Sequence, residues 1–407
     1  MQKNPVVASV NTPRFTLLQM MSEKIRHIPI LNERGEIVDL ASYLHRLVLP
    51  VAEPEVGDRE LEYVTECITS NWISSVGKFV TQFEEEFARF CGTKYAVATS
   101  NGTVALHLAL VVLGIGAGDE VIVPTLTFIA TANAVTYTGA RPVFVDSERY
   151  TWNIDPEKIE AAITPRTKAI IPVHLYGHPA DMGPILKLAK KYHLYVIEDA
   201  AEAHGALCHG QTVGSIGDMG CFSFFGNKII TTGEGGMITT NNKEFAQKAK
   251  MLRDHGVSPD KKYWHPIIGF NYRLTNVQAA IGVAQLEKID RLLERKREIA
   301  GLYRSLLKDV AGITQPPEAS WAKNVFWMYS ILVEKEYGMS RDDLIARLGD
   351  NGVDSRPVFY PIHTMPPYKQ NLVLPVAEEL ASKGISLPSG IGLRDEEIER
   401  VASLIKK

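Results

Sequence analysis

Two residues, Asp199 and Lys228, have types and positions that could do chemistry together. Asp199 ends an apolar run that begins at Leu194 and is typical of a buried strand, and Lys228 ends the stretch Ser223–Lys228 (SFFGNK) in a Gly/Asn turn. A lysine amine can form a Schiff base with an aldehyde, and a buried carboxylate can keep a ring nitrogen protonated. The pair therefore predicts chemistry on pyridoxal 5'-phosphate (PLP), whose protonated ring accepts electrons from a substrate carbanion.

Lys228 would have two tasks in this chemistry. It would hold the cofactor and, once an amine displaces it, move a proton between the substrate carbon and the cofactor. A surface turn lysine is the alternative, and the apolar neighbours Phe222, Phe224 and Ile229 argue against it. We therefore expect Lys228 to be the catalytic residue.

A phosphate site is predicted at Ser100–Thr103 (SNGT), between a predicted strand and a predicted helix. Free N–H groups and the helix dipole favour a phosphate there, so Gly102 and Thr103 are candidate cofactor-binding residues. Ser223, five residues before Lys228, could add its hydroxyl. The alternative is an ordinary Asn-Gly turn with a Thr cap.

Phe128 is a candidate for stacking on the cofactor ring. It follows the predicted strand Glu120–Val123 and would emerge at the carboxyl edge, where ligands bind in open α/β sheets. An ordinary core phenylalanine is the alternative.

The elements that must position these residues indicate an α/β fold. From about residue 94, β-rich runs alternate with helical patterns, which predicts a mostly parallel central sheet with helices on both faces. Predicted strands are Tyr95–Thr99, Glu120–Val123, Pro142–Asp146, Ala169–His174, Leu194–Asp199, Cys221–Phe225 and Met237–Thr240. Predicted helices include Thr103–Leu113, Pro156–Ile163 and Met182–Tyr192.

Three regions are predicted along the chain. Residues 46–275 would form the large domain, beginning with amphipathic segments at Glu60–Ile68 and Val80–Phe90, the first with Asp58 as N-cap. Residues 276–407 would form a smaller α/β domain with a long charged helical stretch to about residue 307, a strand near residues 327–333 and a helix near residues 341–348. In residues 1–45, the run from 25 to 40 reads as strand, turn, strand and resembles the closing half of a CBS module. We expect a packing appendage there, and ligand binding is the open alternative.

Composition excludes several partners. The 407 residues carry a net charge of −3, which gives no reason to expect nucleic acid or an anionic membrane. The four cysteines form no CxxC pair, so we expect neither a zinc site nor a disulfide framework, and a cytoplasmic location. The start has no apolar signal core, and we expect no membrane span. His174 and His178 are four apart, but they lie in a strand followed by Gly177 and Pro179, so no metal site is predicted there.

Four motifs in order resemble the DegT/DnrJ/EryC1/StrS family of PLP-dependent sugar aminotransferases. They are residues 174–177 (HLYG), 198–205 (EDAAEAHG), 223–228 (SFFGNK) and 232–236 (TGEGG), and the resemblance covers about residue 50 to the end. It implies a fold-type I aminotransferase acting as a homodimer with active sites at the interface. Asn271 would then reach the cofactor phosphate of the partner subunit, and Glu202 would face the cofactor's hydroxyl side, where many relatives carry Gln. Relatives that dehydrate sugars have His in place of Lys228, so the resemblance favours transamination.

The same resemblance implies the reactants. The amino group would come from L-glutamate and go to a nucleotide-linked keto-deoxysugar, and residues 263–273 are similar to the subgroup that aminates C-4 of GDP-4-keto-6-deoxymannose. A UDP- or dTDP-linked keto sugar, a keto-octulosonate, and a non-catalytic regulatory or nucleotide-sensing role stay open.

Four further residues are candidates for substrate binding. Trp264 and His265 could stack on or bond to a nucleotide base. Tyr360 and His363 lie in a Pro-rich loop, which suits either a substrate wall or a stiff connection.

Overall fold

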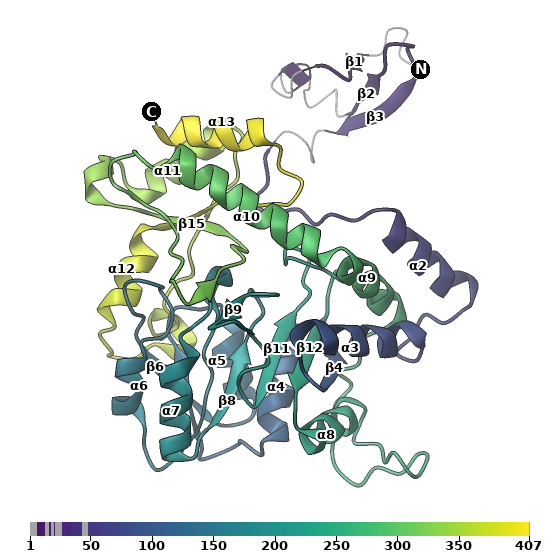
Figure 1. The fold of residues 1–407 in the computed structure, drawn as a ribbon, viewed down its shortest axis with the longest axis vertical. Coiled ribbons are helices and arrows are strands. Elements are labelled where there is room, and N and C mark those ends of the chain that lie inside the picture. The colour runs from purple at the N-terminus through teal and green to yellow at the C-terminus, as the bar shows by residue number, and fades with distance from the viewer. Residues whose placement is uncertain (1–5, 13–15, 18–19, 21–26, 43–47, 407) are drawn as a thin grey trace.

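The computed structural model describes residues 6–12, 16–17, 20, 27–42 and 48–406, and its centre is a seven-stranded sheet (Figure 1). The strand order is β4-β12-β11-β8-β7-β5-β6. β12 runs antiparallel to both of its neighbours, and the other paired strands run parallel. The predicted mostly parallel α/β sheet is thus confirmed. The strands are β4 (Tyr95–Thr99), β5 (Glu120–Pro124), β6 (Arg141–Val145), β7 (Thr167–Ile170), β8 (Tyr195–Asp199), β11 (Met219–Ser223) and β12 (Gly236–Thr240).

Helices cover both faces of this sheet because successive strand residues point to opposite sides. In β4, Ala96 and Ala98 pack in one core, and Val97 packs in the other. Ile122 and its neighbour Val121 divide in the same way. The helices of this part are α3 (Lys78–Cys91), α4 (Gly102–Val112), α5 (Ala130–Tyr137), α6 (Pro156–Ala162), α7 (Met182–Tyr192) and α8 (Lys243–Arg253).

Helix α2 (Asp58–Thr69) begins one residue earlier than its predicted cap allows. Gly57 is the N-cap and Asp58 is already helical, so the predicted cap at Asp58 was wrong. The reason is that Glu60 reaches back and accepts a hydrogen bond from the Gly57 N–H at 2.8 Å. In this half of a capping box, the N3 side chain accepts the hydrogen bond of the N-cap N–H, so Gly57 serves as the N-cap.

The part of the chain after residue 275 begins with two helices. The predicted single helical stretch is two helices, α9 (Asn276–Glu287) and α10 (Ile289–Leu306), which meet at Lys288. Buried residues of α9 lie in the core of the large sheet, whereas Tyr303 of α10 lies in a separate core. The predicted domain boundary at residue 275 stays a prediction. That separate core underlies a four-stranded sheet, β13 (Ile313–Thr314), β15 (Tyr329–Val333), β17 (Gly384–Leu387) and β16 (Arg356–Pro357), with α11 (Arg341–Asp350), α12 (Pro375–Lys383) and α13 (Asp395–Lys406) nearby.

The described N-terminal residues form a separate three-stranded sheet, purple in Figure 1. It contains β1 (Ala8–Ser9), β2 (His27–Leu31) and β3 (Ile37–Ser42), with a turn in which Gly35 has φ of 79°. The predicted strand, turn, strand is confirmed, and its resemblance to a CBS module stays a prediction. Across the described ranges, no helix combines the length and apolarity needed to span a bilayer.

Candidate active site

Lys228 lies in the turn that follows β11, with its side chain only 11% exposed. Its Nζ is 3.9 Å from Glu202 Oε1 and 3.7 Å from the centre of the Trp327 ring. Burial lowers the pKa of Lys228, against the attraction of the Glu202 and Asp199 carboxylates. A lowered pKa increases the share of neutral amine, the form that attacks a carbonyl.

Asp199 ends β8 and lies beside Cys221 of the parallel strand β11, as the sequence predicted for a buried strand end. The Thr131 hydroxyl donates to its Oδ2 at 2.8 Å, and the Ala201 N–H donates to its Oδ1 at 3.2 Å. Burial raises the pKa of Asp199, and these bonds together with Lys228 offset only part of that rise. The protein therefore leaves this buried carboxyl group without a full counter-charge, and a protonated pyridine nitrogen would supply it.

Glu202 is buried beside Lys228 and is held by the backbone of the HLYG motif. The Tyr176 N–H donates to Glu202 Oε2 at 2.8 Å. Tyr176 has φ of 52°, which is rare for a bulky residue. Its ring lies 5.1 Å from the Phe359 ring and 6.1 Å from the Trp327 ring, stacked on both. Burial raises the pKa of Glu202, and the nearby Lys228 ammonium opposes that rise.

The HLYG motif must end in glycine because of the backbone conformation and close contacts of Gly177. Its φ is +98°, and a Cβ atom at this position would lie 2.9 Å from the Trp327 backbone nitrogen. Any side chain would push Trp327 away from Lys228. The motif therefore brings Tyr176, whose N–H holds Glu202, into contact with Trp327, whose ring faces Lys228.

The residues predicted to bind phosphate lie where the start of α4 meets the end of β11, and phosphate binding there stays a prediction. Asn101 caps α4 by accepting the Val104 N–H at 3.0 Å, and Gly102 and Thr103 open its first turn, whose N–H groups have no acceptor within the helix. A Cβ atom on Gly102 would lie 2.7 Å from Ser223 Cβ. Only glycine lets the helix start approach Ser223 this closely, and the donors so gathered fit the phosphate of PLP.

Phe128 lies in the loop after β5, three residues before Thr131, and is 55% exposed. Its ring centre is 5.8 Å from that of Phe359, which itself stacks on Tyr176. The loop thus brings an open aromatic face to the neighbourhood of Asp199. Stacking on the cofactor ring stays a prediction.

Trp264, His265 and Asn271 lie on the extended loop that follows α8 and projects from the rest of the chain (Figure 1). Trp264 is 55% exposed, the His265 ring contacts the His255 carbonyl at 2.9 Å, and Asn271 accepts a hydrogen bond from Arg273 at 3.0 Å. Within the described residues of one chain, no contact joins the three to Lys228. Their predicted roles stay predictions.

The two candidate residues of the Pro-rich loop differ in their exposure to solvent. Tyr360 is 55% exposed and follows Phe359, whose N–H donates to the Tyr176 hydroxyl at 2.9 Å. His363 is buried, with its ring nitrogens 2.7 Å from Thr125 Oγ1 and 3.2 Å from Glu378 Oε1. These contacts fit a residue that holds the loop against β5 better than one that binds substrate.

His174 and His178 have their ring nitrogens in hydrogen bonds to protein atoms. His174 contacts Glu198 at 3.0 Å and accepts the Ala180 N–H at 3.0 Å. His178 contacts the Pro179 carbonyl at 2.8 Å and accepts the Ala319 N–H at 3.0 Å. Both histidines therefore fix the backbone around the site.

Thr131 and Trp327 are the site residues that sequence reasoning missed. Thr131 bonds to Asp199, and the Trp327 indole N–H donates to the Asn227 carbonyl at 2.7 Å, which fixes the turn before Lys228. Both contacts join residues far apart in the chain. The one local signal was the position of Thr131 after the loop that carries Phe128.

Comparisons with known proteins identify the family of the chain. Residues 54–406 match the model of the DegT/DnrJ/EryC1/StrS aminotransferase family. The chain is 52% identical over 360 residues to GDP-perosamine synthase of Caulobacter vibrioides, covering 88% of this chain and 97% of that protein. It is 48% identical over 360 residues to GDP-perosamine synthase of Escherichia coli O157:H7, covering 88% and 98%. In structure it is similar to S. venezuelae DesV, with 38% identity, a TM-score of 0.81 and coverage of 85% and 93%. The match spans every element that builds the Lys228 site, and the chain therefore belongs to the DegT/DnrJ/EryC1/StrS family of PLP-dependent aminotransferases.

Proposed function

We propose that this protein transfers the amino group of L-glutamate to the C-4 ketone of GDP-4-keto-6-deoxymannose. The observation that carries the amino-transfer part is the buried Lys228 amine, which faces Glu202 and shares its site with Asp199. The substrate part rests on similarity to the two GDP-perosamine synthases, each matched over almost its full length. The product would serve polysaccharide synthesis, including O-antigen, in the cytoplasm.

Each residue of the site has a task that follows from its surroundings. PLP, when bound, supplies an electron sink for the carbanion formed at the substrate carbon. Lys228 would hold the cofactor between turnovers and, when displaced, carry the proton to and from the reacting carbon. Asp199 would hold the ring nitrogen's proton by offering a buried negative charge, which Thr131 keeps in place. Gly102, Thr103 and Ser223 would bind the phosphate.

Glu202 would control the charge of Lys228. Its carboxylate lies 3.9 Å from Nζ and favours the ammonium form, whereas burial favours the neutral amine. The two effects oppose each other, so the amine can change its protonation during turnover. Glu202 would also face the cofactor's hydroxyl side, as the resemblance implies.

The substrate assignment is tested by half-reactions. The PLP-loaded protein is first converted with L-glutamate to its pyridoxamine form, and GDP-, UDP- and dTDP-linked keto sugars and a keto-octulosonate are then added separately. We expect the pyridoxal absorbance to return fastest with GDP-4-keto-6-deoxymannose. Faster return with another acceptor would reassign the substrate, and no return with any acceptor would favour a regulatory or nucleotide-sensing protein.

The homodimer is tested by mixing two inactive variants. If Asn271 serves the partner's cofactor, a hybrid dimer of Lys228→Ala and Asn271→Ala chains contains one site with both residues intact. Mixed subunits should then regain activity that neither variant has alone. No recovery in a mixture shown by mass to contain hybrid dimers would place Asn271 in its own chain's site or in none.

A further inference from the structure

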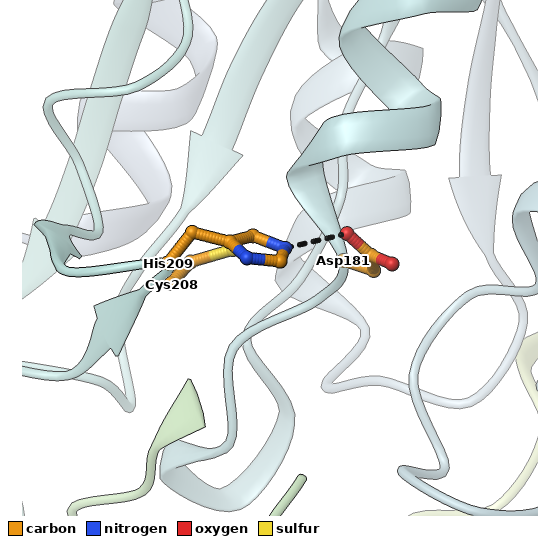
Figure 2. A group of neighbouring side chains, drawn as sticks. All are labelled: Asp181, Cys208 and His209. Atoms are coloured by element: carbon orange, nitrogen blue, oxygen red, sulfur yellow. Dashed lines mark ion pairs between the residues drawn. The ribbon is translucent and has the colours of Figure 1, made fainter. Parts of the chain in front are cut away.

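A second cluster of reactive side chains consists of Asp181, Cys208 and His209 (Figure 2). Asp181 caps the N-terminus of α7, Cys208 ends the short strand β9 (Leu207–Cys208), and His209 begins the turn to β10 (Gln211–Thr212). One potential ligand atom from each lies within 4.8 Å of the other two. In Figure 2 the His209 ring and the Asp181 carboxylate point toward each other, and their Nε2 and Oδ1 atoms are 3.5 Å apart.

The three ligand types suit one class of ion. Thiolate, imidazole and carboxylate together are typical ligands of zinc and similar divalent transition-metal ions. At bond lengths of about 2.0 to 2.3 Å, a tetrahedral ion holds its ligand atoms roughly 3.3 to 3.7 Å apart. The His209–Asp181 distance is already in this range. The Cys208 sulfur lies within 4.8 Å of both partner atoms and donates to the Ala180 carbonyl at 3.6 Å, so it needs a side-chain adjustment of at most about 1 Å.

The surroundings hold these ligands in place. The His209 ring stacks on Trp321 with centroids 5.3 Å apart, and the His209 N–H donates to the Trp321 carbonyl at 2.8 Å. Asp181 is fixed by accepting the Gly183 N–H at 3.1 Å. Cys208 is buried, whereas the side chains of His209 and Asp181 are 55% and 32% exposed. The imidazole and the carboxylate are therefore open to an ion from solvent, and the thiol is the buried ligand.

We propose that Asp181, Cys208 and His209 bind a divalent transition-metal ion of the zinc type and leave one coordination position to water. The Cys208 thiol loses its proton to solvent when the metal–sulfur bond forms. Thiolate and carboxylate then neutralise the two positive charges of the ion. Because an ordinary thiol is protonated near neutral pH, each ion bound there should release about one proton.

Such an ion would fasten the β9–β10 hairpin to the start of α7. The residue before Asp181, Ala180, donates its N–H to His174, whose other ring nitrogen contacts Glu198 next to Asp199. The ion would thus stiffen the segment that reaches back to the cofactor site. We expect a stabilising role, which is independent of the substrate proposed above.

The test is a Zn²⁺ titration of the PLP-loaded protein after treatment with a chelator, in competition with a chromophoric chelator. We expect one Zn²⁺ per chain, a higher thermal midpoint when it is bound, and a sulfur-to-metal absorption band with Co²⁺. Three variants each remove one ligand: Asp181→Asn keeps a good helix cap, His209→Asn tolerates the positive φ, and Cys208→Ser is nearly isosteric. Loss of a residue that only supports a metal ligand weakens metal binding roughly 10- to 100-fold. Loss of a direct ligand should weaken Zn²⁺ binding by at least that factor in each variant.

Two matched variants make the result specific. Cys67→Ser removes another buried free thiol, and His193→Asn changes another histidine of positive φ, at the opposite end of α7. Both should bind Zn²⁺ like the parent. The proposal is overturned if the parent binds no stoichiometric Zn²⁺, or if Asp181→Asn and His209→Asn, checked for unchanged thermal midpoints in chelator, bind it as tightly as the controls do.

Discussion

Gly102→Ala gives the sharpest test of the phosphate cradle. The added Cβ atom would lie 2.7 Å from Ser223 Cβ, where an ordinary contact begins at 3.4 Å, so the start of α4 and the end of β11 must separate by about 0.7 Å. A hydrogen bond of about 2.9 Å to a phosphate oxygen would lengthen to about 3.6 Å and no longer count as one. A charge-assisted bond is worth about 1.5 to 3 kcal/mol, so losing one should weaken PLP binding about 10- to 150-fold.

The assay is an absorbance titration of the apo-protein with PLP, which reads binding without turnover. Gly301→Ala is the matched control, because Gly301 lies in helix α10 and a Cβ atom there meets open space. Helix propensity favours alanine in both variants, so only the contact with Ser223 differs. If the two variants bind PLP with affinities within about threefold of each other, less than 1 kcal/mol, the phosphate does not sit at the start of α4.

Three further predictions concern buried ionisable groups: Asp199 and Lys228 of the site, and His204, whose ring packs on Phe222 and Phe224. Thr131→Val should lower the thermal midpoint of the apo-protein more at pH 8 than at pH 4. The pKa of Asp199 is raised in the folded protein, so stability falls as the pH rises and this group ionises. The Thr131 hydroxyl stabilises chiefly the ionised form, so its loss matters most at the higher pH. Glu202→Gln should lower the pKa of Lys228 further, because it removes a charge that raises it, and the pH dependence of amine labelling in the apo-protein measures this. Burial lowers the pKa of His204 to about 3, whereas the same side chain in the unfolded chain takes up a proton below about pH 6.5. The free energy of unfolding should therefore fall by about 2 kcal/mol by pH 5. His204→Phe should remove that loss in thermal melts.

Each of these has a control or an outcome that contradicts it. Thr127→Val removes a hydroxyl that contacts Thr131 at 3.3 Å and not Asp199, so its effect should be the same at both pH values. An unchanged pKa of Lys228 on Glu202→Gln would mean that the carboxyl group is neutral in the parent. Equal acid sensitivity of the parent and His204→Phe would show that His204 is protonated in the folded state.

Local patterns were sufficient for the parts of the site that local structure creates. Asp199 ends a strand whose apolar run is continuous, and Lys228 follows a Gly/Asn turn between apolar residues, so both positions could be predicted from the sequence. Thr131 and Trp327 carry no such pattern, because their partners, Asp199 and Asn227, meet them only through the tertiary fold. Pattern alone could not separate a core threonine from one that holds a catalytic carboxyl group.

Element types were predictable where hydrophobic periodicity was long. The range of α7 was predicted without error, whereas the break at Lys288 was not, since α9 and α10 form one continuous helical pattern in sequence. Strand β16 was missed because its two residues are too few to show an alternating pattern. Cap positions also depend on side chains that reach back, as Glu60 does to Gly57.

The antiparallel strand β12 sets the order in which the chain can assemble its phosphate cradle. β4, which leads into Gly102, pairs only with β12 in the central sheet, and the same strand pairs with β11, which ends at Ser223. During synthesis from the N-terminus, β4 therefore has no strand partner in the central sheet until residues 236–240 have been synthesised. A nascent chain that stalls before β12 leaves β4 without a strand partner and exposes an unpaired strand edge.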